Sequence, residues 1–103
     1  MDNHTIARRL TEHANQLRGR EGNLYRARAY RQAAFTIQAL DSPVEELLAK
    51  AGIGALRALP GIGAHLAFTV ERLVRTGEFL TYEDGVARGL LPTRKRRQDR
   101  LSA

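Results

Sequence analysis

A short glycine-rich turn that opens directly into a helix constrains this chain more than any other stretch. The turn reads Leu59-Pro60-Gly61-Ile62-Gly63, and apolar residues follow it at helical spacing. Its proline fixes the backbone φ angle and lacks an N–H group, whereas its two glycines allow backbone angles and close approaches that a Cβ atom would prevent. The helix then begins with free backbone N–H groups, at Gly63, Ala64 and His65. These groups and the positive end of the helix dipole predict an anion site of phosphate size.

The size and composition of the chain fit one small domain. It has 103 residues, of which 43% are hydrophobic, enough for a modest core. It contains no cysteine, so neither a disulfide nor a thiolate metal site can stabilise it. No apolar stretch approaches the roughly 20 residues of a membrane span, and the first residues lack the pattern of a secretory signal. We therefore expect a soluble, cytoplasmic protein without a membrane contact.

The charge of the chain favours an anionic partner. Its formal net charge is +6 and its pI is about 10.7. Residues 1–40 and 91–103 each carry +4, and residues 41–90, which contain the glycine-rich turn, carry −2. Nearly all the basic residues are arginines, since Lys50 and Lys95 are the only lysines. Arginine suits bidentate phosphate contacts and lacks the amine that Schiff-base chemistry requires.

Apolar periodicity predicts an all-α fold, with no alternating pattern long enough for a strand. The expected architecture is a compact bundle of about four helices and a short hairpin helix, ending in the glycine-rich turn and its helix, with a flexible basic tail. Helices are expected at residues 3–18, from residue 24 onward, and at residues 43–50, 55–59 and 64–76. Asn3 and Ser42 are predicted N-caps, and Gly19 and Gly77 are predicted to end helices.

Each long helix has an apolar stripe that predicts its buried face. The first two helices are expected to bury Ile6, Leu10, Ala14, Leu17, Ala27, Tyr30, Ala34 and Ile37. The last is expected to bury Leu66, Ala67, Val70, Leu73 and Val74 and to expose His65, Thr69, Arg72 and Thr76. Arg28 and Arg31 project from another side of the second helix, where they form either a solvated face or a phosphate contact. Tyr30 fits both a core position and a contact position.

Beyond Gly77 the pattern weakens. Residues 78–84 are compatible with another helical turn, Gly85 and Gly89 are expected to interrupt it, and a basic tail follows Pro92. We expect a domain at residues 1–80 and an irregular or partly helical extension with the basic tail at residues 81–103.

The turn and the residues after it resemble the helix-hairpin-helix motif of DNA-binding proteins. The motif positions are filled by Leu59, Pro60, Gly61, Ile62, Gly63, Ala67 and Val70. Together with the upstream stretch from Asn23 to Ala34 and the later Thr76-Gly77, the pattern resembles the amino-terminal, DNA polymerase β-like domain of family X DNA polymerases. The resemblance covers roughly residues 3–80.

The resemblance implies a helical domain that docks on single-stranded or gapped DNA near a terminal phosphate. It implies that backbone N–H groups around Gly61 and Gly63 bind that phosphate, and it places Tyr30, Arg31 and the basic position Arg26 near the DNA. With these, the residues expected at the DNA are Gly61, Gly63, Ala64, His65, Thr69, Arg72, Arg26, Arg28, Tyr30 and Arg31. It implies no cofactor beyond a monovalent cation, Na⁺ or K⁺, held by the backbone carbonyls of Arg57, Leu59 and Ile62.

The chain departs from that family at the position that carries lyase chemistry. Members with deoxyribose-phosphate lyase activity form a Schiff base through a lysine, and Thr69 stands at the matching position. A hydroxyl cannot form that imine, and His65, at a matching basic position, is a poor substitute for the amine. No catalytic triad, acid pair or metal-ligand cluster is evident. We therefore expect no enzymatic activity.

Two functions remain open from the sequence. The first is a sequence-nonspecific DNA-binding module in repair or replication, with a possible protein partner in a repair complex. The alternative is a protein-interaction or scaffold module that keeps the fold but has lost DNA binding, as the acidic middle segment and the missing lysine suggest.

Overall fold

The computed structural model describes residues 1–17 and 23–91, and this part of the chain is helical without a strand. Its six helices are α1 (Asn3–Leu17), α2 (Leu24–Gln38), α3 (Val44–Ala51), α4 (Ile53–Arg57), α5 (Ala64–Thr76) and α6 (Tyr82–Ala87). The predicted all-α fold is confirmed. The helix end predicted at Gly19 and the basic tail predicted after Pro92 lie outside the described residues.

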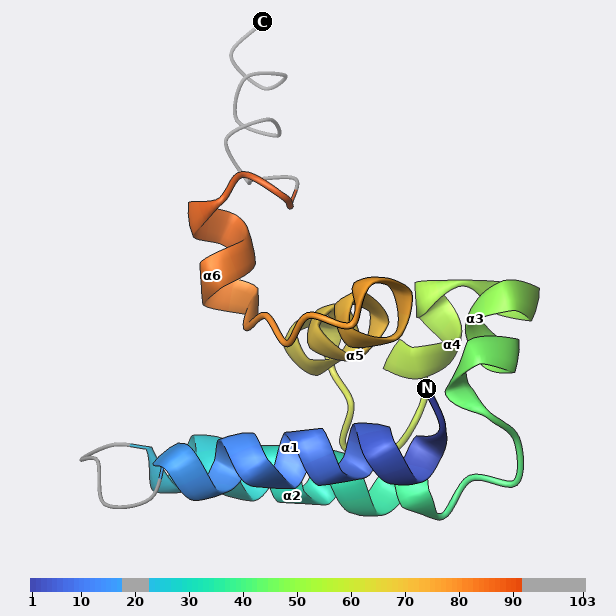
Figure 1. The fold of residues 1–103 in the computed structure, drawn as a ribbon, viewed down its shortest axis with the longest axis horizontal. Helices are drawn as coiled ribbons and strands as arrows, with labels where there is room; N and C mark the ends of the chain where they lie inside the picture. Colours follow the sequence, from blue (N-terminus) through green and yellow to red (C-terminus); the bar gives the residue numbers. More distant parts are fainter. Residues whose placement is uncertain (18–22, 92–103) are drawn as a thin grey trace, which may run out of the picture.

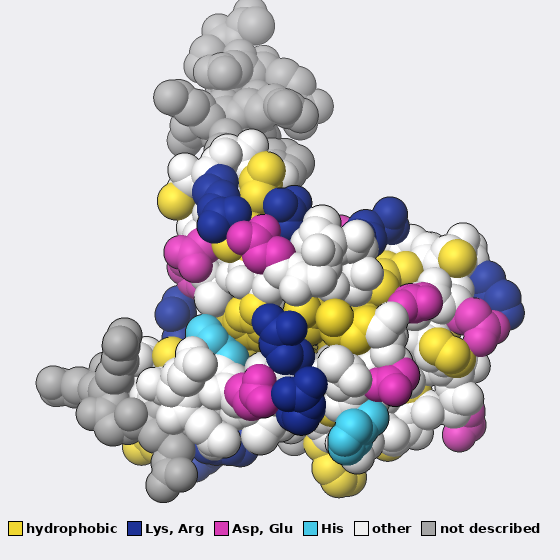
Figure 2. Space-filling model, in the orientation of Figure 1, with side chains coloured by type: hydrophobic (Ala, Val, Ile, Leu, Met, Phe, Trp, Pro, Cys, Tyr) yellow, Lys and Arg dark blue, Asp and Glu magenta, His cyan; other side chains and the backbone are white. Residues whose placement is uncertain are grey.

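The helices form two layers. α1 and α2 lie side by side as one layer, and α3, α4 and α5 form the other (Figure 1). The chain after α5 runs back along that helix, so α6 lies beside the start of α5, on the side away from α3 and α4 (Figure 1). On the face shown in Figure 2, hydrophobic side chains are visible as a band between the layers, and basic and acidic side chains are interspersed around it. The predicted stripes of α1, α2 and α5 meet in one core, in which Leu17, Leu66 and Val74 are only partly buried.

The first two helix caps differ from their prediction. The Asp2 side chain, rather than that of Asn3, caps α1 by accepting the Thr5 N–H at 2.8 Å. The Asn3 side chain reaches α3 instead, where its Oδ1 accepts the Val44 N–H at 2.9 Å and its amide donates to the Ser42 carbonyl at 2.9 Å. Asn3 therefore ties the start of α1 to the start of α3, and Pro43, not Ser42, occupies the N-cap position of α3.

The glycine-rich turn connects α4 to α5. The Ile62 N–H donates to the Leu59 carbonyl at 3.1 Å, and Gly61 has the positive φ of 78° that this turn requires. Ile62 inserts into the core, and the Thr36 hydroxyl of α2 donates to the Pro60 carbonyl at 2.9 Å. The buried Ile62 side chain and the hydrogen bond to Pro60 therefore fix the turn on the two sides of Gly61.

α6 continues through a glycine that the sequence pattern marks as an interruption. Thr81 caps this helix by accepting the Asp84 N–H at 3.1 Å. Gly85 is buried inside it because the Phe68 ring of α5 occupies the space that a side chain would need. An ideal Cβ at Gly85 would lie 2.5 Å from the Phe68 Cζ. The predicted interruption at Gly85 is therefore wrong, and the glycine allows α6 to pack on α5.

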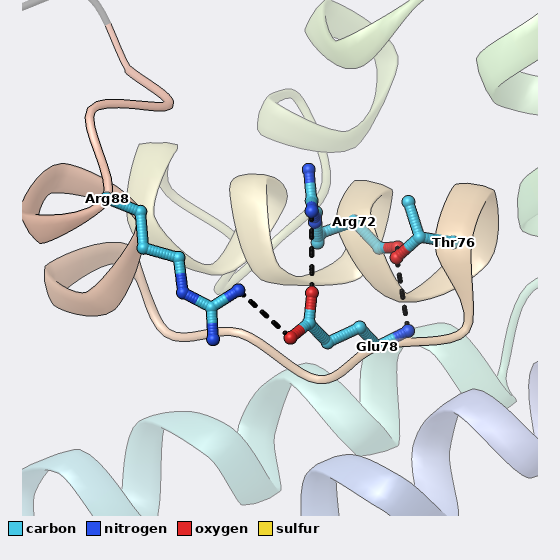
Figure 3. Close-up of polar contacts among 4 residues, drawn as sticks. All are labelled: Arg72, Thr76, Glu78 and Arg88. Atoms are coloured by element: carbon cyan, nitrogen blue, oxygen red, sulfur yellow. Dashed lines mark hydrogen bonds and ion pairs between the residues drawn. The ribbon is translucent and has the colours of Figure 1, made fainter.

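The segment between α5 and α6 is fixed by Glu78 (Figure 3). Its carboxylate pairs with Arg72 of α5 at 3.4 Å and with Arg88, at the end of α6, at 3.1 Å. Its backbone N–H donates to the Thr76 hydroxyl at 3.1 Å. These contacts hold the segment against α5 and against the end of α6. The boundary predicted at residue 80 falls just before α6 and stays a prediction.

Candidate nucleic-acid interface

The start of α5 has free backbone donors. Gly63 is its N-cap residue, in an extended conformation, and no side chain caps the helix. The N–H groups of Gly63, Ala64 and His65 have no acceptor among the described residues, and all three residues are exposed. Because four N–H groups at a helix start lack partners within the helix, such a terminus suits an anion. The predicted backbone geometry is confirmed, whereas phosphate binding stays a prediction.

A pocket of about 550 Å³ adjoins this helix start. Its walls come from the hairpin, from the first half of α2 and from the first turn of α6. The lining residues are Tyr25, Arg26, Ala29, Tyr30, Gly61, Gly63, Ala64, His65, Leu66, Tyr82 and Glu83. Of the residues that the sequence predicts at the DNA, the pocket brings together Arg26, Tyr30, Gly61, Gly63, Ala64 and His65.

The other predicted contacts lie elsewhere. Arg28 and Arg31 are exposed on α2 outside the pocket, and the Arg31 guanidinium donates to the Asn15 side chain at 3.0 Å. Arg72 lines a second groove and pairs with Glu78. Thr69 is 0% exposed, and its hydroxyl donates to the His65 carbonyl at 3.3 Å. The prediction that Thr69 lies on an exposed face is wrong: its side chain is buried beside the Tyr30 phenol of α2, so it cannot reach a ligand in this conformation.

Tyr30 combines the two positions that the sequence left open. Its ring is 9% exposed and packs edge-on against His13, with ring centroids 4.6 Å apart, yet it also lines the pocket. Burial raises the pKa of the Tyr30 phenol above its ordinary value, and the nearby Glu83 carboxylate adds to this effect. The phenol is therefore neutral near pH 7 and can donate a hydrogen bond.

Sequence reasoning missed the two pocket residues of α6. Tyr82 stacks on His65, with ring centroids 3.9 Å apart and an interplanar angle of 10°. Glu83 forms an ion pair with Arg26 across the pocket. A signal for this helix was present, because Thr81 followed three positions later by Asp84 is a helix-start pattern. The two glycines after it obscured that pattern.

The backbone carbonyls that the resemblance assigns to a monovalent cation differ in their availability. The Leu59 carbonyl accepts the Ile62 N–H, whereas those of Arg57 and Ile62 accept no hydrogen bond within residues 1–17 and 23–91. Carbonyl oxygens with free lone pairs are the donors that hard cations prefer. The same ranges contain no group of three or more His, Cys, Asp or Glu side chains that could hold a metal ion.

The chain is a helical domain built around a hairpin, in which the short α4 and the longer α5 are joined by a glycine-rich turn and α5 has a free start directly after the turn. The comparison with protein families agrees with this class. The helix-hairpin-helix domain matches residues 1–79, and the chain belongs to that family. No curated protein sequence matches the chain significantly. Within the described ranges, no helix has the length and apolar character needed to cross a membrane.

Proposed function

We propose that this helix-hairpin-helix domain binds the phosphate backbone of DNA without sequence preference. The observation that carries the proposal is the exposed, uncapped start of α5, which opens into a pocket that also contains Arg26. Helix-hairpin-helix domains generally bind nucleic acid, which supports the same conclusion. A role in DNA repair or replication rests on the resemblance to the amino-terminal domain of family X DNA polymerases.

In this proposal the phosphate oxygens accept hydrogen bonds from the N–H groups of Gly63, Ala64 and His65. Backbone donors contact phosphates rather than base edges, so they fix position without reading sequence. Arg26 supplies a bidentate cation beside them. Binding of this kind is electrostatic, and nonspecific dissociation constants of about 10⁻⁴ to 10⁻⁶ M are usual at physiological salt.

Fluorescence anisotropy with gapped, nicked, single-stranded and duplex DNA tests the proposal. We expect affinity to fall steeply with salt, with a log–log slope of about −0.9 for each duplex phosphate neutralised. Backbone amide shifts recorded during the titration should be largest at residues 61–65. If no DNA form binds at low salt, the proposal is wrong.

We further propose that the domain has no lyase activity. Thr69 lacks an amine and is buried, and Lys50, on α3, pairs with Glu46 at 3.8 Å. Borohydride treatment with an abasic DNA substrate should therefore trap no covalent product. A trapped product would show that another amine of this chain reaches the abasic sugar.

The free carbonyls of Arg57 and Ile62 support a monovalent cation as part of the interface. In this proposal Arg57, Leu59 and Ile62 would hold the ion, which would add a positive charge between the hairpin and the DNA backbone. Replacing K⁺ with tetramethylammonium at constant ionic strength should then weaken binding. Equal affinity in both salts would exclude a role for the ion.

An exposed face of α2 favours protein interaction as a second candidate function. Leu24 and Phe35 are each 73% exposed, and helical spacing places them on the same face as Arg28 and Arg31. None of these four residues lines the pocket, so this face stays open when the pocket is filled. A protein partner that stays bound to the domain in a pull-down after nuclease treatment and at moderate salt would support this function. Loss of that partner on nuclease treatment would exclude it.

A further inference from the structure

The pocket beside the hairpin contains its own anion. Glu83, in the first turn of α6, pairs with Arg26 of α2, and the two side chains are 50% and 51% exposed. Among the residues that the structure describes, Arg26 is the only arginine or lysine that lines the pocket, and Glu83 is the only carboxylate. The formal charges of the two side chains therefore cancel at the place where a phosphate would bind.

Glu83 is held there by the packing of α6. Tyr82, next to it, stacks on His65 at the helix start of α5. Gly85 packs against Phe68, and Arg88, at the other end of α6, pairs with Glu78 at 3.1 Å. These contacts anchor both ends of α6, so the carboxylate of Glu83 belongs to an ordered element that forms one wall of the pocket.

A carboxylate and a phosphate use the guanidinium of arginine in the same way, through charge-assisted hydrogen bonds. We propose that Glu83 is a competing anion built into the pocket, which holds Arg26 until a DNA phosphate takes its place. This inference rests on the proposed function and adds to it a residue that lowers the affinity for DNA, because a phosphate must displace Glu83 from Arg26.

The test compares Glu83→Gln with Asp84→Asn, using a labelled single-stranded oligonucleotide and fluorescence anisotropy at fixed salt. Both substitutions remove one negative charge from the first turn of α6, but Asp84 lines a different groove, beside His13. Asp84→Asn therefore controls for net charge and for the helix dipole. Because exposed ion pairs contribute about 0.2–1 kcal/mol, we expect Glu83→Gln to bind up to about fivefold more tightly than the control.

A second arm places both substitutions in an Arg26→Gln background. If Glu83 acts through Arg26, the advantage of Glu83→Gln over Asp84→Asn disappears there, as a double-mutant cycle requires. Amide spectra of each variant report whether α6 stays packed on α5. A gain that survives without Arg26 would overturn the inference.

The possible failures are distinguishable. If the wild-type domain binds DNA and Glu83→Gln binds no more tightly than Asp84→Asn, Glu83 is not a competitor and the proposed function stands. If neither the wild-type domain nor Glu83→Gln binds at low salt, the proposed function is wrong and the inference falls with it.

Discussion

The two glycines of the hairpin turn have different physical roles. Gly61 has a φ of 78°, and an ideal Cβ there would lie 2.7 Å from the Gln32 Cγ. Gly63 has a φ of −90°, and a Cβ there would have no heavy atom within 4 Å. The fold therefore requires a glycine at position 61, whereas the open surface at position 63 faces the place where a ligand would approach.

Alanine substitutions separate these roles. Gly61→Ala should lower the free energy of unfolding by about 1–2 kcal/mol, because an alanine is strained in the left-handed region. Gly63→Ala should lower it by at most about 1 kcal/mol, the usual difference between glycine and alanine at an N-cap. The same methyl group should weaken DNA binding, because it crowds the N–H groups of α5.

Urea denaturation and DNA anisotropy measure the two effects. Gly54→Ala is the matched control, since a Cβ at Gly54 also meets open space and Gly54 lies on α4 outside the pocket. If Gly63→Ala binds DNA as tightly as Gly54→Ala, the helix start is not the phosphate contact.

His13 couples stability to pH. Its ring lies between Tyr30 and Phe79, with centroids 4.6 and 4.7 Å away, and it faces Arg26, Glu83 and Asp84. Burial lowers the pKa of His13 below 6.5, and the Arg26 charge lowers it further. The unfolded chain therefore takes up this proton at a higher pH than the native chain, so stability falls as the pH drops below about 6.5.

We expect the melting temperature to fall between pH 7 and pH 5.5, and to fall less in His13→Phe, which keeps an aromatic ring but cannot be protonated. Thermal denaturation followed by circular dichroism measures the difference. His4→Phe is the control, because His4 is exposed on α1. Equal pH dependence in the wild type and His13→Phe would assign the effect to other groups.

Among the elements, α6 depends on a few contacts with α5. Gly85 packs against Phe68 and Tyr82 stacks on His65, and the polar contacts are Glu83 with Arg26 and Arg88 with Glu78. The hydrogen bond from Arg88 lowers the pKa of Glu78 below its ordinary value. The core shared by α1 to α5 contains no residue of α6. α6 should therefore be able to detach while the rest of the domain stays folded.

Gly85→Val tests this separation. Its side chain would overlap Phe68, and overpacking usually costs about 1–3 kcal/mol. We expect faster hydrogen exchange of the amides at residues 82–88, with the amides of α1 and α2 unchanged. Ala87→Val adds a branched side chain at an exposed position of the same helix and should leave exchange near the wild-type rate. Loss of protection throughout the chain would instead make α6 part of the cooperative unit.

At the scale of the whole molecule, local patterns predicted α1, α2, α3 and α5 well because each combines an apolar stripe with a glycine or proline near its ends. The short α4, expected at residues 55–59, lies two residues earlier, at Ile53–Arg57. The errors involve contacts between distant parts of the chain. Asn3 caps α3 from 41 residues away, and Thr69 is buried beside Tyr30 of α2. The hairpin side of the pocket could be predicted from the sequence, but its α6 wall could not. A glycine at position 85 predicts a helix interruption, and only the contact with Phe68 explains why a glycine is required inside α6.

The charge of the whole chain should govern DNA affinity separately from the hairpin. Residues beyond Leu91 contain five basic side chains, whereas the pocket contains one arginine that is already paired. Replacing those five with glutamine changes the formal net charge from +6 to +1. Because counterion release scales with the number of phosphates neutralised, this variant should bind every DNA form more weakly and with a shallower salt dependence. Its order of preference among gapped, single-stranded and duplex DNA should not change, because the hairpin still makes the local contacts. Salt titrations on each DNA form measure both quantities, and an altered order of preference would mean that the basic residues make structure-specific contacts.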